Sequence, residues 1–291
     1  TYLPVTLKYF DFGNEGMTVT NAVETTMIWG TVSGASMVGM VISLLLSVGL
    51  PIFLGIFIYK KTKAWVPAFF IGCGIFVGFA MILEQICHAI VLTVTGDVIR
   101  DNIWLYAIYG GLAAALFEEC GRWIAMKFCL KKHLTRENAL MYGAGHGGIE
   151  AFLILGMSSM SNLLTAAMIN GGLMEKTMTA LEPAQQEVTY HQLSVLWTTP
   201  AYQFYLAPVE RISAIALQIA LSILVYSAVK TGRKLHLAAA FGLHFAVDFL
   251  TVVCASTIPT WALELGLLMV VAVICVAVYK LAYVSSAEKK A

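Results

Sequence analysis

Seven ionisable side chains that can bind metals or transfer protons lie within three apolar segments of the sequence. A charge inside a bilayer costs at least ~2.5–3.5 kcal/mol on insertion scales, so such residues are functional candidates by default. Each of the two later segments holds a histidine and a carboxylate four residues apart, a spacing that puts both on one helix face. At about 1.5 Å per helical residue, the acidic and imidazole groups of all three segments lie ~12–20 Å from one end of their helices. The residues are Glu118, Glu119, Arg122, His146, Glu150, His244 and Asp248.

Histidine and carboxylate side chains that converge from separate helices are typical of a catalytic site for a divalent metal, with zinc the expected ion. Three protein ligands hold such a metal and water takes the fourth position, while a neighbouring glutamate serves as general base. The alternative hypothesis is a buried polar network that holds helices together without chemistry. Because the whole set lies at one depth, we favour a reactive or metal-binding site.

The two adjacent glutamates do not both point at one centre, because neighbouring residues diverge by about 100° around a helix. We assign Glu118 to the site and pair Glu119 with Arg122, three residues further along. The swapped assignment of the two glutamates stays open. Small residues allow helices in membranes to approach closely, and four of them surround His146. These are Gly143, Gly145, Gly147 and Gly148.

A second group of ionisable residues is predicted nearer the outer face. Glu84 and Glu210 each lie nineteen residues from the inner end of their segment, which is ~29 Å along the helix. His88 and Arg211 stand close to them in the sequence. We favour a structural clamp near the headgroups, because ion pairs close to water are inexpensive; a substrate or proton path is the alternative. Glu264, near another outer end, is expected to be solvated.

The composition places these residues in a membrane protein. Hydrophobic residues form 59% of the 291 residues and charged residues 12%, against ~45–50% and ~25% in soluble domains. So little charge does not cover a soluble surface, which excludes a cytosolic enzyme and a disordered chain. A net charge of +1 offers no field that would attract a nucleic acid. We predict an all-α, polytopic integral membrane helix bundle in contact with membrane lipids and without a nucleic-acid partner.

Seven apolar segments are long enough to cross a hydrocarbon core of ~30 Å as helices. Basic clusters follow the first, third, fifth and seventh of them. The positive-inside rule therefore predicts a cytoplasmic C-terminus and an outer N-terminus, as for a protein of the bacterial cytoplasmic membrane. The expected spans are 33–59, 65–94, 103–130, 138–158, 203–229, 235–257 and 260–283.

The chain is expected to form a single transmembrane domain. Residues 1–16 are expected to be non-native sequence, because Met17 opens the stretch that leads into the first apolar run. The connection between the fourth and fifth spans begins with an apolar part, 159–170, which either extends the fourth helix or lies in the membrane interface. The expected parts are an extracytoplasmic segment over 1–32, a transmembrane domain over 33–283 with an outer loop at 159–202, and a cytoplasmic tail over 284–291.

Three motifs together resemble the YhfC family of intramembrane metalloproteases. They are FEExxR at 117–122, GHGGxE at 145–150 and HxxxD at 244–248. Their order and their placement in separate spans are also similar to a wider group that contains CAAX-prenyl endopeptidases, bacteriocin-processing proteins and PrsW-type proteases. Arg122 follows Glu119 by three residues rather than four, and Asp248 stands where Asn is usual. Both departures argue against a prenyl-protein substrate.

The resemblance implies a metallopeptidase that acts on a membrane-associated protein or peptide. It implies that Glu118, with Glu119 behind it and Arg122 beside it, activates water. The same wider group includes a non-catalytic scaffold subunit of gamma-secretase, so a scaffold or regulatory subunit is the alternative function. A proton-coupled transporter is a third hypothesis, against which the lack of an internal repeat counts. The implied groups that bind the metal or polarise the scissile carbonyl are His146 or Glu150, and His244 with Asp248.

Overall fold

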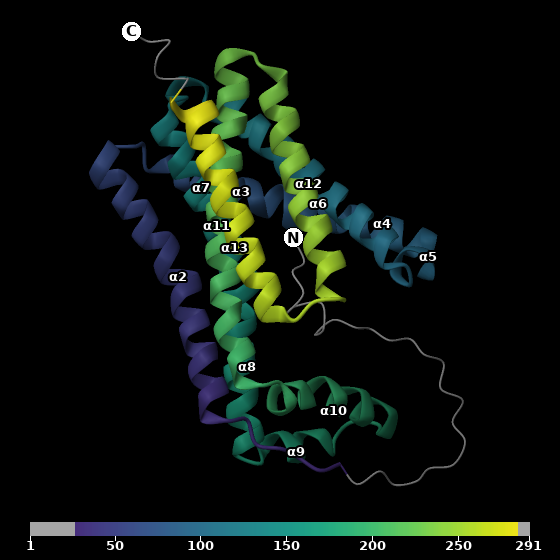
Figure 1. The fold of residues 1–291 in the computed structure, drawn as a ribbon. Coiled ribbons are helices and arrows are strands. Elements are labelled where there is room, and N and C mark those ends of the chain that lie inside the picture. Colours follow the sequence, from purple (N-terminus) through teal and green to yellow (C-terminus); the bar gives the residue numbers. More distant parts are fainter. Residues whose placement is uncertain (1–26, 285–291) are drawn as a thin grey trace.

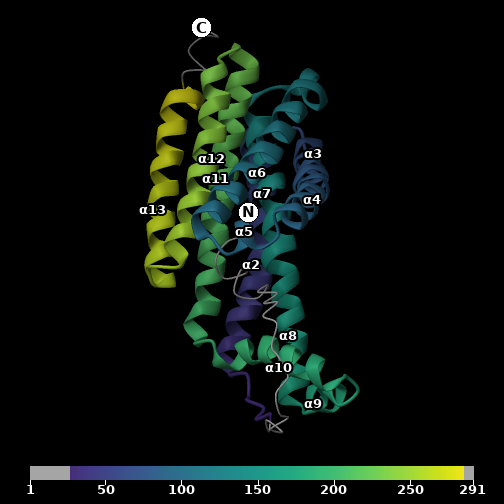
Figure 2. The same ribbon diagram turned by 90° about the vertical axis from the view of Figure 1, so that its right-hand side faces the viewer.

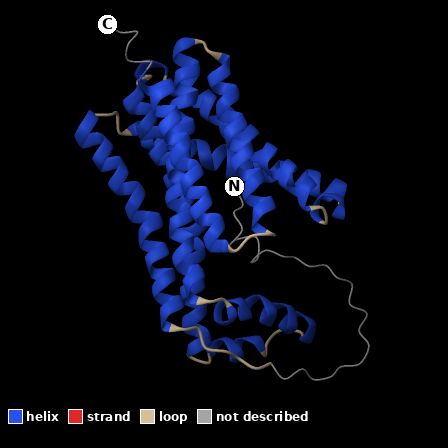
Figure 3. Ribbon diagram, in the orientation of Figure 1, coloured by secondary structure: helices blue, strands red, loops and turns tan. Residues whose placement is uncertain are grey.

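The computed structural model describes residues 27–284, and within this part of the chain all regular structure is helical, with no strand (Figure 3). Seven helical segments there are long and apolar enough to cross a membrane, which confirms the predicted bundle. The predicted non-native residues 1–16 and all but the first residue of the predicted tail lie outside the described residues. The orientation of the bundle in the membrane stays a prediction.

Several spans consist of helices joined end to end through π-helical turns. The bounds of the spanning elements are α2 Gly34–Thr62, α3 Pro67–Phe76, η1 Val77–Glu84, α4 Gln85–Thr95, α6 Ile103–Ile124, η2 Ala125–Cys129, α7 Arg136–Ala151, η4 Phe152–Gly156, α8 Met157–Asn170, α11 Ala201–Thr231, α12 Lys234–Ala255, α13 Thr260–Val278 and η5 Tyr279–Val284. Short helices lie in the connections: α5 Asp97–Arg100, η3 Lys131–His133, α9 Leu173–Met178 and α10 Pro183–Thr198. Because π-turns are frequent at functional sites, η4, which begins two residues after Glu150, lies where function is expected.

Polar side chains define where the helices that carry the charged motifs begin. The Asn102 side chain accepts hydrogen bonds from the backbone N–H groups of Trp104 and Leu105 at the start of α6. The Thr135 hydroxyl accepts one from the Asn138 N–H at the start of α7. Such caps satisfy N–H groups that have no partner within the helix. They fix where α6 and α7 begin, and hence the level of the residues that follow.

Helices α7 and α11 form the centre of the bundle (Figures 1 and 2). Helix α7 packs against α2, α3 and α11, while α11 also packs against α2, α12 and α13. In its most apolar stretch α11 is 72% buried, against 17–39% for the other six spans. Helix α6 packs mainly against α12. The three helices with charged motifs, α6, α7 and α12, therefore meet around α11.

The fourth span is longer than predicted. It continues from α7 through η4 into α8 and ends at Asn170, so the apolar part of the predicted connection extends the helix. Gly171 and Gly172 follow, and Gly172 adopts φ of +69°, a left-handed conformation that suits glycine. Helices α9 and α10 then form a lobe at the lower end of the bundle in Figure 1. The remainder of the connection is thus largely helical.

Glycines on α7 bring its backbone against the neighbouring helices. A Cβ added at Gly145 would overlap the Phe69 carbonyl of α3, and one added at Gly72 of α3 would overlap the Tyr142 carbonyl of α7. The contact between α3 and α7 therefore needs glycine on both helices. This close approach supports the reason given above for the glycines around His146.

Replacing Gly145 by Ala is expected to destabilise the protein by ~1–3 kcal/mol, because the added methyl group must push α3 and α7 apart. Gly74→Ala is the matched control on α3, since a Cβ there meets nothing within 4 Å. Thermal unfolding of both variants in the same detergent measures the difference. Equal melting temperatures would show that the two backbones have room to separate.

Candidate metal centre

The structure brings all seven residues of the charged motifs into the interior. Glu118, Glu119 and Arg122 come from α6, His146 and Glu150 from α7, and His244 and Asp248 from α12. All of them are buried, and the most exposed is Asp248 at 7%. The depth count from the sequence therefore predicted a real convergence of side chains.

Glu118 lies at the middle of the cluster. Its Oε2 atom accepts hydrogen bonds from His146 Nε2 at 3.0 Å and from Gln218 Nε2 at 2.9 Å. The same oxygen lies 3.9 Å from His244 Nε2 and 4.0 Å from an Arg122 nitrogen. Glu118 thus contacts residues of α7 and α11 and lies close to α12.

Glu119 contacts both Arg122 and His244. Its Oε2 atom lies 3.3 Å from Arg122 Nε, the pairing expected from the sequence. Its Oε1 atom accepts a hydrogen bond from His244 Nδ1 at 2.9 Å. The two glutamates therefore act on one site after all, because the two nitrogens of the His244 ring face one glutamate each.

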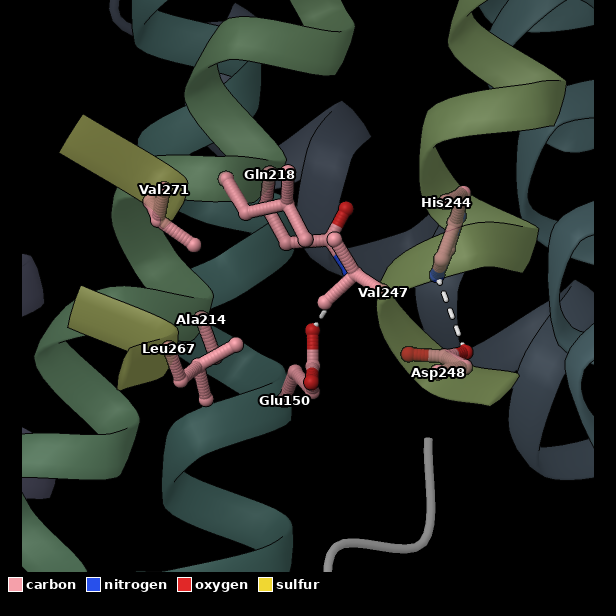
Figure 4. Close-up of a pocket in the computed structure, with 9 residues that line it drawn as sticks. Glu150, Ala214, Gln218, His244, Val247, Asp248, Leu267 and Val271 are labelled. Atoms are coloured by element: carbon pink, nitrogen blue, oxygen red, sulfur yellow. Dashed lines mark hydrogen bonds and ion pairs between the residues drawn. The ribbon is translucent and has the colours of Figure 1, made fainter. Parts of the chain in front are cut away.

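The Glu119 contact fixes the protonation pattern of the His244 ring. An ionised carboxylate only accepts, so Nδ1 carries a proton, and in the neutral ring Nε2 presents its lone pair. Among the described residues Nε2 has no hydrogen-bond partner, and it lies 3.5 Å from Asp248 Oδ2 (Figure 4). A histidine that ligates a metal usually donates its other N–H to a carboxylate, and the Glu119–His244 pair has this form.

Gln218 of α11 is a member of the cluster that the sequence analysis missed. Its amide nitrogen donates to Glu118 Oε2 at 2.9 Å and to Glu150 Oε2 at 2.8 Å, and its amide oxygen accepts from Arg122 Nη2. Arginine only donates and carboxylates only accept, so the amide has one possible orientation. A neutral side chain does not stand out by charge, but Arg211, Gln218 and Ser222 recur at helical spacing on one face of α11.

The predicted outer layer separates into two parts. His88 lies 3.2 Å from Glu84 and 2.7 Å from the Tyr109 hydroxyl, so this pair forms a clamp between α4 and α6, as favoured above. Arg211 instead reaches the central cluster: Nη1 lies 3.4 Å from Glu150 Oε1, and Nη2 pairs with Glu210. Its assignment to an outer layer was wrong, because a residue count places a Cα atom while the long guanidinium side chain extends well beyond it.

The expected solvation of Glu264 is also wrong. Its side chain is 1% exposed, and neither carboxylate oxygen has a hydrogen-bond partner among the described residues. Glu264 lies on α13, which packs along α11. Closeness to a helix end therefore did not predict contact with water.

A small pocket adjoins the cluster between α7, α11, α12 and α13, with room for about one water molecule. Its polar rim combines two carboxylates, an amide and an imidazole, and Figure 4 shows these side chains facing a common space. The rest of the lining is apolar. The pocket is lined by Glu150, Ala214, Leu217, Gln218, His244, Val247, Asp248, Leu267 and Val271.

The donor set and the charge of the cluster fit a divalent cation. Ligand atoms of Glu118, His146 and Glu150 lie within 4.8 Å of one another. The cluster holds six buried carboxylates but two buried arginines. The carboxylates are those of Glu118, Glu119, Glu150, Glu210, Asp248 and Glu264. Buried charge is stable only when it is paired, protonated or coordinated to a metal. His146 Nδ1 and Asp248 Oδ2, which have no hydrogen-bond partner within residues 27–284, provide further ligand capacity.

The comparisons with known proteins agree with the three motifs. The profile of the YhfC intramembrane metalloprotease family matches residues 46–275, which contain all of them. Over 204 residues the chain is 43% identical to an uncharacterized membrane protein YhfC of Bacillus subtilis (strain 168), which covers 67% of this chain and 76% of that relative. No solved structure matches the chain. This chain is a multi-pass membrane protein that belongs to the YhfC intramembrane metalloprotease family.

Proposed function

We propose that the protein is an intramembrane metallopeptidase that hydrolyses a peptide bond of a membrane-associated protein or peptide. The observation that carries the proposal is the buried group of Glu118, His146 and Glu150, whose ligand atoms lie within 4.8 Å of one another. It stands beside a pocket that accommodates about one water molecule. The family name supports the same reading.

We assign the metal, most simply zinc, to His146, Glu150, His244 and Asp248. His146 and His244 offer imidazole nitrogens, which suit zinc, and both lie close to Glu118 Oε2. Glu119 supports this assignment because it holds the His244 ring with Nε2 directed at the cluster. Arg122 in turn neutralises Glu119 at 3.3 Å.

Glu118 is the proposed general base. A divalent cation bound here supplies Lewis acidity, which acidifies a water molecule and polarises the peptide carbonyl. Glu118 takes the proton of that water on a carboxylate oxygen and later returns it to the leaving amine. Gln218 holds Glu118 in place for this transfer through a hydrogen bond of 2.9 Å. The apolar remainder of the pocket limits access of further water.

The proposal also concerns the location of the protein and its substrate. The site residues lie on helices long and apolar enough to cross a membrane, and the basic loops of the sequence favour a cytoplasmic C-terminus, as in a protein of the bacterial cytoplasmic membrane. We therefore propose a membrane-associated polypeptide as the substrate, with lipids in contact with the outer helix faces.

The metal content of the purified protein tests the proposal. Elemental analysis of the wild type in detergent is expected to find about one zinc ion per chain. The double variant His146→Ala/His244→Ala is expected to lose it, because both imidazole ligands are gone. His191→Ala on α10, an exposed histidine, is the matched control and should keep the metal. Absence of metal from a folded wild type would contradict the proposal.

A scaffold function is the second candidate, and one observation favours it. Arg122 donates to the Gln218 carbonyl at 2.6 Å and to the Ser222 hydroxyl at 2.8 Å, so the cluster also ties α6 to α11. Polar contacts of this kind hold helices together in membranes. A scaffold predicts no metal, and a partner whose binding fails when these contacts are removed.

A further inference from the structure

Arg211 of α11 contacts two acidic side chains, one on α7 and one on its own helix. Its Nη1 atom reaches Glu150 Oε1 of α7 at 3.4 Å, and its Nη2 atom pairs with its neighbour Glu210. Glu264 of α13 precedes Leu267 by three residues, as Arg211 precedes Ala214, and Leu267 and Ala214 line the same pocket. Arg211 is fully buried, and its Nε atom has no hydrogen-bond partner among the described residues.

Glu264 is the least satisfied carboxylate of the group. It is 1% exposed, and both of its oxygens lack a hydrogen-bond partner in the part of the chain that the structure describes. Glu264 lies one helical turn from Leu267, which lines the pocket, on a helix that packs along α11. A buried polar group without a partner calls for a ligand or for a second state in which it is paired.

The Glu150–Arg211 contact competes with a metal. Glu150 belongs to the group of three residues that could hold an ion. A divalent cation there would repel the guanidinium over a few ångströms in a medium of low dielectric constant. The contact at 3.4 Å is long for a charged hydrogen bond, and Arg211 keeps its pairing with Glu210 when this contact breaks.

We propose that Arg211 is a positioning residue that exchanges Glu150 for Glu264 when a divalent cation occupies the cluster. In the metal-free state Arg211 holds the Glu150 carboxylate in the interior. In the loaded state the guanidinium pairs with Glu264, whose oxygens stand free to accept it, and Glu150 turns to the ion. The inference rests on the proposed function, because it requires that the cluster binds a metal.

If Arg211 exchanges partners in this way, Glu264 affects the affinity of the cluster for the metal through Arg211. Removing the Glu264 charge leaves the displaced guanidinium with Glu210 as its one carboxylate partner, so the loaded state becomes less stable. The alternative explanation is that Glu264 attracts the cation directly, an effect that does not need Arg211. The two explanations differ when Arg211 is absent: the direct attraction persists, whereas the exchange no longer exists.

Zinc affinity measured by calorimetry on the full chain in detergent separates these cases. Glu264→Gln is expected to weaken zinc binding about tenfold, as for other residues that support ligands without touching the metal. In the Arg211→Gln background the same substitution is expected to leave the affinity unchanged. Glu187→Gln, on an exposed position of α10, is the matched control.

Equal weakening in both backgrounds, or no weakening in either, would overturn the exchange. A wild type that binds no zinc would instead contradict the proposed function, so the two failures are distinct. If Arg211→Gln does not fold, a structure of the zinc-loaded wild type decides. It should place the guanidinium within hydrogen-bond distance of Glu264, and a guanidinium that still contacts Glu150 would overturn the proposal.

Discussion

Glu118→Gln is expected to lower the rate of peptide hydrolysis by a factor of ~10²–10⁴, the usual contribution of a general base. The fold should survive, because the substituted amide oxygen can still accept from His146 and Gln218, which donate to Glu118 at 3.0 and 2.9 Å. What disappears is the carboxylate that takes the proton of water. The measurement is cleavage of transmembrane reporter peptides in proteoliposomes, with products identified by mass spectrometry.

Metal content distinguishes the two roles that Glu118 could have. If Glu118 is the base, the variant is expected to retain zinc while losing hydrolysis. Loss of both would make it a ligand, which its place in the group with His146 and Glu150 also permits. Glu187→Gln serves as the exposed control. Full hydrolysis in Glu118→Gln, with products unchanged, would contradict the mechanism.

The convergence of α6, α7 and α12 could be predicted because two rules of membrane proteins constrain it strongly. Charge inside an apolar span is costly and therefore rare, and helices rise by a fixed length per residue, so depth can be counted. These rules placed Glu118, His146 and His244 at one level, and the structure brings them within hydrogen-bond or near-contact distance. The pairing of Glu119 with Arg122 followed from spacing on a single helix.

Other members of the cluster could not be predicted, for reasons that lie in packing between helices. Gln218 carries no charge, and only the position of α11 between α6 and α7 reveals that its amide joins Glu118 to Glu150. Arg211 reaches the cluster because its side chain is long. Glu264 is buried although it lies near the start of α13, because α13 packs along α11, a contact between helices that depth counting does not describe.

Arg122→Met is expected to cost ~3–5 kcal/mol of stability, the usual penalty when one partner of a buried ion pair is removed. The substitution preserves much of the side-chain volume but leaves the Glu119 carboxylate, 3.3 Å from Arg122 Nε, without its cation. The Gln218 carbonyl and the Ser222 hydroxyl lose their donor as well. In a chain of this size the melting temperature in detergent should fall by about 10 °C.

Arg100→Met is the matched control for the loss of an arginine. That side chain is half exposed and stands 3.9 Å from Asp97, so its ion pair contributes at most ~1 kcal/mol. Adding Glu119→Gln to Arg122→Met should recover part of the lost stability, because it removes the uncompensated charge. If instead the double variant melts lower than Arg122→Met by the full effect of Glu119→Gln alone, the two residues are not coupled. The destabilisation would then come from the lost contacts to α11 rather than from the unpaired glutamate.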